Sequence, residues 1–528
     1  MKKSYSKTEL NNMSKEDLVA LVMASQEKLS LFEERLAQMQ SKQFGRKTER
    51  VECLDQMSIF NEAEGLCDDT VEEPEIEEVV VRRKKRHVGQ REEELEGLPV
   101  RIENYELPEE KLIEIFGEDG WKRLPDEISR MVEIVPAKQE VVEHHIAVYA
   151  GKNTDKIVRA PHPKKLFPGS LCSPSMLAAV MNGKYTNGMP LHRIGQEMER
   201  NDVKIPKRNL ANWVIWGAER YLSLITDRMH EQLLQSHVIH ADETPCWVTK
   251  DGRAANSKSY MFVYRTCELN KEKPIVLYDY QMTRSADHVM EYLKGFHGVL
   301  ETDAYSGYHR VDKESDEITV AHCWAHARRD FADAIKIMPK SGGSKQARKH
   351  TVAHTALTKI KNIYKLENTL ADMTPEERLV ARKQEIAPDV DAFFQWVKSQ
   401  DSNTIGSEKT REGLQYCINQ EQYLRVFLED GEVPIDNSAA ERTIRPFTVG
   451  RNSWKLIDTV HGAKSSAIIY SLVETAKAND LKVFEYLKHL LTEIPQHMDE
   501  TDLNFLDDLL PWSEKLPDEC RKKTNTSK

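Results

Sequence analysis

Two consecutive carboxylates at the end of an apolar run constrain the fold of this chain more than any other feature. In HVIHADETP, residues 237–245, Asp242 and Glu243 follow a segment that a β-strand would bury. A charged carboxylate is costly to bury unless it is paired or binds a metal ion. Because side chains alternate between the two faces of a strand, the two carboxylates cannot enter one pocket. We therefore expect one of them to act in a site and the other to be solvated or hydrogen-bonded.

The segments around this run predict a mixed α/β domain. Three strand-like runs lie at 237–248, 257–266 and 274–280, separated by the turns KDGRAANS and CELNKEK. A helix, SADHVMEYLKGF, follows with Ser285 as its N-cap, and then the strands GVLETDAY and ITVAHCW and the basic helix AHARRDFADAIKI. Three strands in a meander, then helix, strand, strand and helix, is the order of an RNase H-like domain. In such a sheet the first and fourth strands are neighbours.

An aspartate and a glutamate far along the chain complete a candidate metal site. Asp303 ends the fourth strand in LETDAYSGY, so an RNase H-like sheet would place it beside Asp242. Two neighbouring carboxylates repel each other unless a divalent cation lies between them. The segment DNSAAERTIR predicts a helix with Asn437, Glu441 and Arg445 on one face. Asp242, Asp303 and Glu441 are therefore predicted as catalytic residues and as ligands of Mg²⁺ or Mn²⁺, with two ions in a phosphoryl-transfer site.

Each of these acids alone has an ordinary structural explanation. An aspartate that ends a strand is more often a turn or cap residue, and a helical glutamate beside an arginine is usually a surface ion pair. A zinc site is a rival interpretation of HCWAHARRDF, in which Cys323 and His326 form a CxxH and His322 lies four residues before His326. That stretch lacks the HExxH glutamate and any nearby cysteine pair, so no zinc is predicted. The residues assigned a supporting role are His240, Cys323, Trp324 and His326.

Two stretches predict contacts with DNA. The stretch 190–222 contains two amphipathic helices, at 191–199 and 207–221, which indicate a helix-turn-helix motif. Its turn is longer than usual, so a plain helical hairpin is the alternative. RPFTVGRNSWK mixes basic and aromatic residues, which suits a DNA backbone and an unstacked base, although a solvated loop has the same composition. The residues predicted to bind DNA are Lys207, Arg208, Asn209, Arg328, Arg329, Asn437, Arg442, Arg445, Arg451 and Lys455.

Patterning along the chain predicts a multidomain α/β protein. A 4-3 apolar spacing from Leu18 to Met39 predicts a short coiled coil and hence at least a dimer, with a helix packed on its own protein as the alternative. The predicted segments are a coiled coil (1–45), a charged linker (46–95), a region of strands and charged loops (96–165), a helical DNA-binding domain (166–230), an RNase H-like catalytic core (231–335 with 431–460), a helical insertion (336–430) and a helical tail (461–528).

Composition limits the classes of protein that this chain can belong to. The net charge of −11 does not exclude a nucleic-acid partner, because nine acidic and no basic residues lie between Glu62 and Glu78, just before the basic run RRKKR. No apolar run is long enough to cross a membrane, and no apolar segment follows the charged N-terminus. The eight cysteines include no CxxC pair, which fits a reducing compartment. We expect a cytoplasmic protein with no membrane partner.

Together, HADETP, ETDAYSGY, CWAHARRDF, DNSAAERTIRPFTVGRNSW, AIIYSLVETAKANDL and LLPW resemble a transposase of the insertion sequence 66 family. The resemblance covers nearly the whole chain and implies a DDE transposase with an RNase H-like core. The family's acidic triad falls on Asp242, Asp303 and Glu441. The family usually has a small zinc module with two CxxC pairs before the DNA-binding helices, but residues 96–165 contain no cysteine. This region is therefore interpreted as a degenerate zinc module without its ligands.

The resemblance implies a transposase that binds the ends of its own element, cleaves the 3′ ends and joins them to target DNA. Its partners would be element and target DNA, a second copy of the chain, and small accessory proteins encoded beside it. The alternative from another class is a catalytically inactive or domesticated DNA-binding protein. A zinc hydrolase is a more distant alternative.

Overall fold

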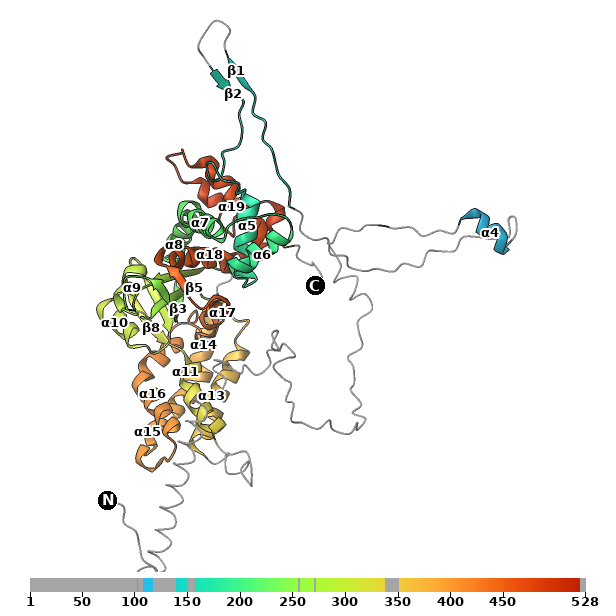
Figure 1. The fold of residues 1–528 in the computed structure, drawn as a ribbon. Coiled ribbons are helices and arrows are strands. Elements are labelled where there is room, and N and C mark those ends of the chain that lie inside the picture. The colour runs from blue at the N-terminus through green and yellow to red at the C-terminus, as the bar shows by residue number, and fades with distance from the viewer. Residues whose placement is uncertain are drawn as a thin grey trace, which may run out of the picture. The chain divides into compact units, whose positions relative to one another are not determined.

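The computed structural model describes residues 102, 108–116, 139–150, 157–254, 257–269, 272–337 and 351–522 (Figure 1). The chain divides into two units, Met1–Gly45 with Glu143–Lys522 and Arg46–Val142 with Lys523–Lys528. In the second unit the described residues include helix α4 (Glu109–Phe116). The predicted coiled coil and charged linker lie outside the described residues. All of the remaining description concerns the first unit.

A five-stranded mixed sheet forms the centre of this unit. Its order is β6-β5-β3-β7-β8, so the first and fourth predicted strands are neighbours. Strand β3 pairs antiparallel with β5 and parallel with β7, with His240 opposite Glu301. The five predicted strands are thus confirmed, and their bounds are β3 (Val238–Cys246), β5 (Ser259–Thr266), β6 (Val276–Gln281), β7 (Gly298–Thr302) and β8 (Ile318–His322).

Helices pack against the sheet, and strand β5 is buried at nearly every position. Helix α17 (Ser438–Trp454) packs on β3 and β5, and α18 (Val460–Ala478) packs on β6. On α18, the hydroxyls of Ser471 and Thr475 accept hydrogen bonds from the backbone N–H groups of Tyr278 (2.7 Å) and Val276 (2.9 Å). These N–H groups belong to an edge strand and would otherwise lack a ladder partner. The edge is therefore closed by side chains of a helix.

Strand β6 also carries an acid that supplies a pH-dependent prediction. Burial raises the pKa of Asp279 from 3.8 to about 6, and the amide of Gln281, 2.7 Å away, and Lys464 offset part of this rise. Between those pH values the folded chain holds a proton that the unfolded chain has released, so its stability falls as pH rises. Because asparagine does not titrate, we expect Asp279→Asn to remove up to about 3 kcal/mol of this pH-dependent decline in the free energy of unfolding, at ~1.4 kcal/mol per pKa unit.

The measurement is urea unfolding of both proteins at pH 4, 5, 6 and 7. The difference between the unfolding midpoints of the variant and the wild type should grow from pH 4 to pH 6 and then level off. A constant difference over that range would contradict the raised pKa of Asp279.

The helices before the sheet follow the sequence prediction in part. The two predicted amphipathic helices are present as α6 (Leu191–Arg200) and α7 (Lys207–Gly217). The second helical stretch runs further than predicted, because a π-helical turn, Ala218–Leu222, joins α7 to α8 (Ser223–Leu233). Ahead of them, α5 (Pro174–Met181) has Ser173 as N-cap and is followed by a second π-helical turn, Asn182–Thr186.

The predicted helical insertion is helical throughout its described part. Thr374 and Glu377 form the predicted capping box, with Pro375 at the first helical position. The insertion has a separate apolar core around Trp324, whose indole N–H donates to Leu424 O at 2.8 Å. Its elements, with the preceding helix, are α11 (Trp324–Ile337), α13 (Val352–Thr369), α14 (Pro375–Ala381), Arg382–Ile386, α15 (Ala387–Ser399), Ser402–Thr404, α16 (Glu408–Leu424) and Val426–Leu428.

Several short elements were not predicted. Helix α10 (Ser306–Glu314) contains a glycine and lacks a side-chain cap, so its local signal is weak, yet its residues Tyr308 and Val311 are completely buried. Strands β4 (Val248–Lys250) and β9 (Ile457–Thr459) pair in parallel across more than 200 residues of sequence. Helix α9 (Ala286–Tyr292) is the predicted helix with Ser285 as its N-cap, and α19 (Val483–His497) lies in the predicted helical tail. The remaining elements are β1 (Val148–Ala150), β2 (Ile157–Arg159), α20 (Phe505–Asp508) and Asp518–Cys520. Among the described helices, none combines the length and the apolar character that a membrane span needs.

Candidate active site

The two carboxylates that end the apolar run of β3 have different environments. The side chain of Glu243 is only 1% exposed, and it accepts hydrogen bonds of 2.5 Å from Arg284 Nε and from the Tyr308 hydroxyl. Burial raises the pKa of Glu243, and these two partners offset part of that effect. Glu243 is therefore the hydrogen-bonded member of the pair, as expected from the alternation of faces. Asp242 is left for a site on the other face.

Asp303 directly follows β7, as predicted, but Asp242 lies in the middle of β3 and not at its end, because β3 continues to Cys246 through its pairing with β5. Asp242 is half-buried, and its Oδ1 accepts the Glu243 N–H at 2.8 Å. Asp303 follows β7 directly, keeps 24% of its side chain exposed and accepts the Tyr305 N–H at 3.0 Å. Strands β3 and β7 are parallel with His240 opposite Glu301, and Asp242 and Asp303 each follow this pair by two residues, so the register brings the two aspartates level with each other.

The electrostatics of Asp242 link three of the predicted residues. Burial raises the pKa of Asp242 well above its usual range, and the negative charges of Glu243, Asp303 and Glu441 raise it further. The backbone N–H of Glu243 opposes this only in part. Asp242 therefore lies within electrostatic range of acids on two other elements. A divalent cation would relieve this repulsion, and three carboxylates are a donor set that suits Mg²⁺ or Mn²⁺.

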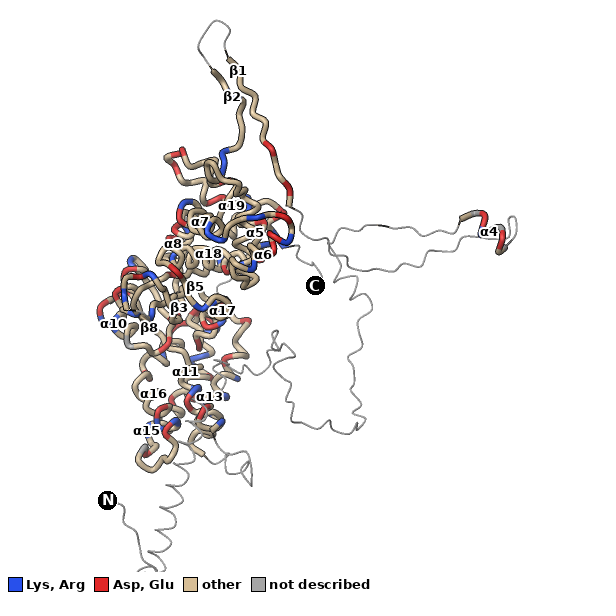
Figure 2. The backbone as a smooth tube through the Cα atoms, viewed as in Figure 1, with Lys and Arg blue, Asp and Glu red and all other residues tan. Residues whose placement is uncertain are grey.

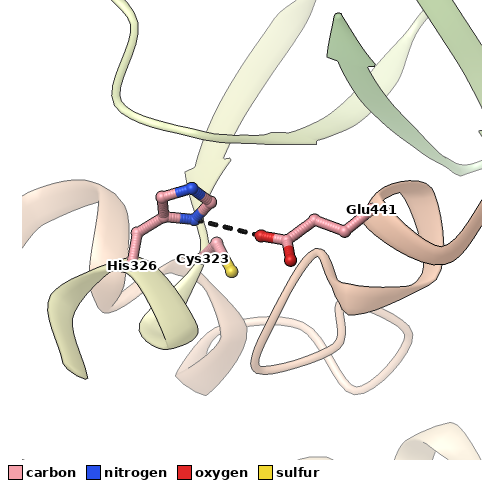
Figure 3. A group of neighbouring side chains, drawn as sticks. All are labelled: Cys323, His326 and Glu441. Carbon is pink, nitrogen blue, oxygen red and sulfur yellow. Dashed lines mark ion pairs between the residues drawn. The ribbon is translucent and has the colours of Figure 1, made fainter. Parts of the chain in front are cut away.

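Glu441 lies in the first turn of α17, with 15% of its side chain exposed. Its Oε1 is 3.3 Å from Arg329 Nη2 and 3.7 Å from His326 Nδ1 (Figure 3). Cys323 contributes a sulfur to the same group, and one ligand atom from each of Cys323, His326 and Glu441 lies within 4.8 Å of the others. Glu441 therefore faces both the aspartates and a thiol–imidazole pair.

A buried amide fixes the start of α17 on β3. Asn437 is 1% exposed; its Nδ2 donates to Ala241 O at 2.8 Å, and its Oδ1 lies 2.7 Å from His240 Nδ1. Since the amide oxygen accepts, His240 Nδ1 carries the proton. Burial lowers the pKa of His240 to about 4, so the ring stays neutral. The contact holds the helix that carries Glu441 against the strand that carries Asp242.

The prediction that Asn437 contacts DNA does not fit this position, because its amide is buried and already hydrogen-bonded to Ala241 O and His240.

Two further residues that were predicted to bind DNA are engaged within the protein. Arg451 donates to Thr244 Oγ1 at 3.0 Å and to Pro245 O, and Arg442 donates to Glu268 at 2.5 Å. Arg328 is half-buried. The predicted DNA-binding residues that are exposed are Lys207, Arg208, Asn209, Arg329, Arg445 and Lys455. Figure 2 shows basic residues on α7, α11 and α17 among acidic ones.

His322 and His326, the two histidines of the rival zinc interpretation, lie on different elements. His322 ends β8 instead of lying on a helix with His326, so the two do not share a helical face as the rival zinc interpretation requires. The ring of His322 is 2% exposed and packs 4.4 Å from that of Tyr423 and 5.2 Å from that of His309. Cys323 and Trp324 are fully buried. The i and i+4 histidine pair is therefore wrong as a metal site.

Sequence reasoning missed two charged residues beside the acids. Arg284 lies 3.6 Å from Asp303 Oδ2, while it also binds Glu243 and stacks 3.6 Å from the ring centre of Tyr305. Only its place before the N-cap Ser285 distinguishes it in the sequence. Glu301 is 1% exposed and opposite His240, and burial raises its pKa well above the usual range. Its position two residues before Asp303, on the same face of β7, was the available signal.

Comparison with known proteins agrees with this architecture. The family model described as "Transposase IS66 family" matches residues 169–465, "IS66 C-terminal element" matches 471–512, and "Transposase C of IS166 homeodomain" matches 31–102. Uncharacterized protein y4qI of Sinorhizobium fredii is 28% identical over 411 residues, which cover 76% of this chain and 72% of the relative.

Two further uncharacterized proteins of Sinorhizobium fredii are each 24% identical to this chain. Protein y4hP aligns over 400 residues, 74% of this chain and 71% of its own. Protein y4jD aligns over 405 residues, 74% of this chain and 76% of its own. Since the first of the three family models covers more than half of the chain, the protein belongs to the Transposase IS66 family.

Proposed function

We propose that the chain is a DDE-type DNA transposase, which binds the ends of its insertion sequence, cleaves the 3′ ends and transfers them to target DNA. The observation that carries this proposal is the shared electrostatic environment of Asp242, Asp303 and Glu441, which come from strand β3, the residue after β7 and helix α17. The sheet order supports an RNase H-like core, because β3 and β7 are the parallel neighbours that bring the two aspartates together. The divisions predicted from the sequence remain our proposal for its domains.

In this proposal Asp242, Asp303 and Glu441 hold Mg²⁺ or Mn²⁺. When bound, such cations activate the attacking oxygen and stabilise the leaving oxygen of an in-line phosphoryl displacement. Asn437 and His240 keep Glu441 and Asp242 in register through the contact of α17 with β3. Arg284 places positive charge next to Asp303, where it also offsets the buried charge of Glu243.

The exposed basic residues are the proposed DNA contacts. Lys207, Arg208 and Asn209 begin α7, so they can reach a phosphate or a groove edge from the helix N-terminus. On α17, Arg445 follows Glu441 by four residues and so lies on the same side of the helix, next to the acids. Lys455 ends that helix. A second copy of the chain, through the predicted coiled coil, and small accessory proteins complete the proposed partners.

The test uses the purified full chain and labelled duplexes that carry the two ends of the element encoding it. With Mn²⁺ we expect 3′ nicks at the boundary of the element, and with an end of unrelated sequence we expect none. Binding of the ends without nicking would support the alternative, an inactive DNA-binding protein. Absence of both would reject the proposal.

A further inference from the structure

The group formed by Cys323, His326 and Glu441 combines three kinds of metal ligand beside the acids (Figure 3). Cys323 directly follows β8, His326 lies in the first turn of α11, and Glu441 lies in the first turn of α17. Their ligand atoms lie within 4.8 Å of one another. The group is thus assembled from the residue after β8 and from the first turns of two helices.

His326 and Cys323 have surroundings that differ from those of ordinary core residues. Nδ1 of His326 is buried and has no hydrogen-bond partner within the described part of the chain, although it faces Glu441 at 3.7 Å. A buried polar atom that stays unpaired costs stability, which points to a missing ligand. Sγ of Cys323 accepts the backbone N–H of Asn437 at 3.1 Å. This is the kind of contact that stabilises a metal-bound thiolate.

The chemistry of the donors selects the cation. A thiolate, an imidazole and a carboxylate favour Zn²⁺ over Mg²⁺ or Mn²⁺, which prefer oxygen alone. We propose that Cys323, His326 and Glu441 bind Zn²⁺ and that this withdraws Glu441 from Asp242 and Asp303. The thiol proton of Cys323 passes to solvent when the metal binds. The binding itself is independent of the proposed function, whereas the consequence, inhibition of DNA cleavage, rests on it.

The existing ion pairs of Glu441 are weak enough for its carboxylate to move to a zinc ion. Arg329, which lies 3.3 Å from Glu441 Oε1, is 44% exposed, so this pair is weak and can open at little cost. Three protein ligands leave a fourth position for water, as in other open zinc sites. The proposed zinc site therefore competes with Asp242 and Asp303 for the carboxylate of Glu441, and it is not a hydrolytic centre.

The binding test uses Co²⁺, the spectroscopic substitute for Zn²⁺, added to the full chain. We expect a near-ultraviolet thiolate-to-cobalt charge-transfer band in the wild type, its loss in Cys323→Ser, and binding weaker by at least about tenfold in His326→Gln. The matched controls Cys520→Ser, at another buried cysteine, and Cys53→Ser/Cys67→Ser should keep the band. A wild type without the band, or a folded Cys323→Ser protein that retains it, would overturn the site.

X-ray absorption of the wild type with one equivalent of Zn²⁺ covers the case in which Cys323→Ser does not fold. One sulfur at about 2.3 Å with nitrogen and oxygen neighbours supports the site. A shell of nitrogen and oxygen alone overturns it.

The nicking assay then separates the site from its consequence. In Mn²⁺, added Zn²⁺ should inhibit the wild type, and half-inhibition of Cys323→Ser should need at least about tenfold more Zn²⁺. The cobalt band without any nicking would uphold the zinc site and count against the proposed function. If the cobalt band appears but Zn²⁺ does not inhibit nicking, the proposal that the zinc site shares Glu441 with the acid cluster is overturned.

Discussion

Asp242→Asn is expected to reduce Mn²⁺-dependent nicking of the element ends by on the order of 10³-fold or more. Asparagine keeps the shape of the side chain but removes the charge that the proposed cations need. The same change should raise the urea midpoint of unfolding, because it removes a charge that burial and three neighbouring acids disfavour. Loss of activity with a gain of stability cannot result from misfolding.

Three measurements follow on one preparation: nicking, binding of labelled ends and urea unfolding at pH 7. The control is Asp279→Asn, the same chemical change on strand β6, which should nick like the wild type. Equal loss of binding and nicking in Asp242→Asn, or a lower unfolding midpoint, would contradict the assignment of Asp242 to a metal-binding acid cluster.

Arg382→Ala is expected to lower the free energy of unfolding by about 3–5 kcal/mol, the usual cost of removing one partner from a buried ion pair. Arg382 is completely buried and donates to the carbonyls of Phe427, Asp430 and Val433, each at 2.8 Å. Its Nε also donates to Glu367 at 3.0 Å. The substitution leaves three buried carbonyls and a carboxylate that is 12% exposed without their donor.

The matched control for Arg382 is Arg425→Ala. Arg425 is 31% exposed and pairs with Asp391 at 2.7 Å and Glu421 at 3.1 Å, so its loss should cost no more than about 1 kcal/mol. Urea unfolding measures both variants. Equal effects would contradict the role of the buried Arg382 contacts in holding the segment 427–433, which leads to α17.

Local patterns accounted for the regular elements near the site. The five strands follow from alternation and apolar runs, and the caps at Ser285 and Thr374 follow from residue type and spacing. The prediction that one carboxylate of the Asp242–Glu243 pair is hydrogen-bonded is confirmed, because strand geometry alone requires the two to face opposite ways. Helix α10 had no such signal, and its formation depends on burial of Tyr308 and Val311.

The partners of the charged residues could not be predicted in this way. Zinc was discounted in the sequence because the stretch lacked the HExxH glutamate and a nearby cysteine pair, yet Glu441 joins Cys323 and His326 from 115 residues beyond His326. Asn437 was expected at a DNA surface, because an asparagine beside basic residues has the same local sequence whether it is exposed or buried. Its burial results from the packing of α17 on β3.

The sequence by itself determined most of the strands and helices, where several of them begin, and which acids follow apolar runs, because these properties depend on neighbours within a few residues. It placed Asp242 at the end of its strand, whereas pairing with β5 extends β3 to Cys246. Only the tertiary structure decided that Arg284 lies beside Asp303, that Glu301 is buried opposite His240 and that Glu441 also faces a thiol and an imidazole. The physical reason is that pairing energies act through space. Which distant side chains meet is fixed only when strands align and helices pack.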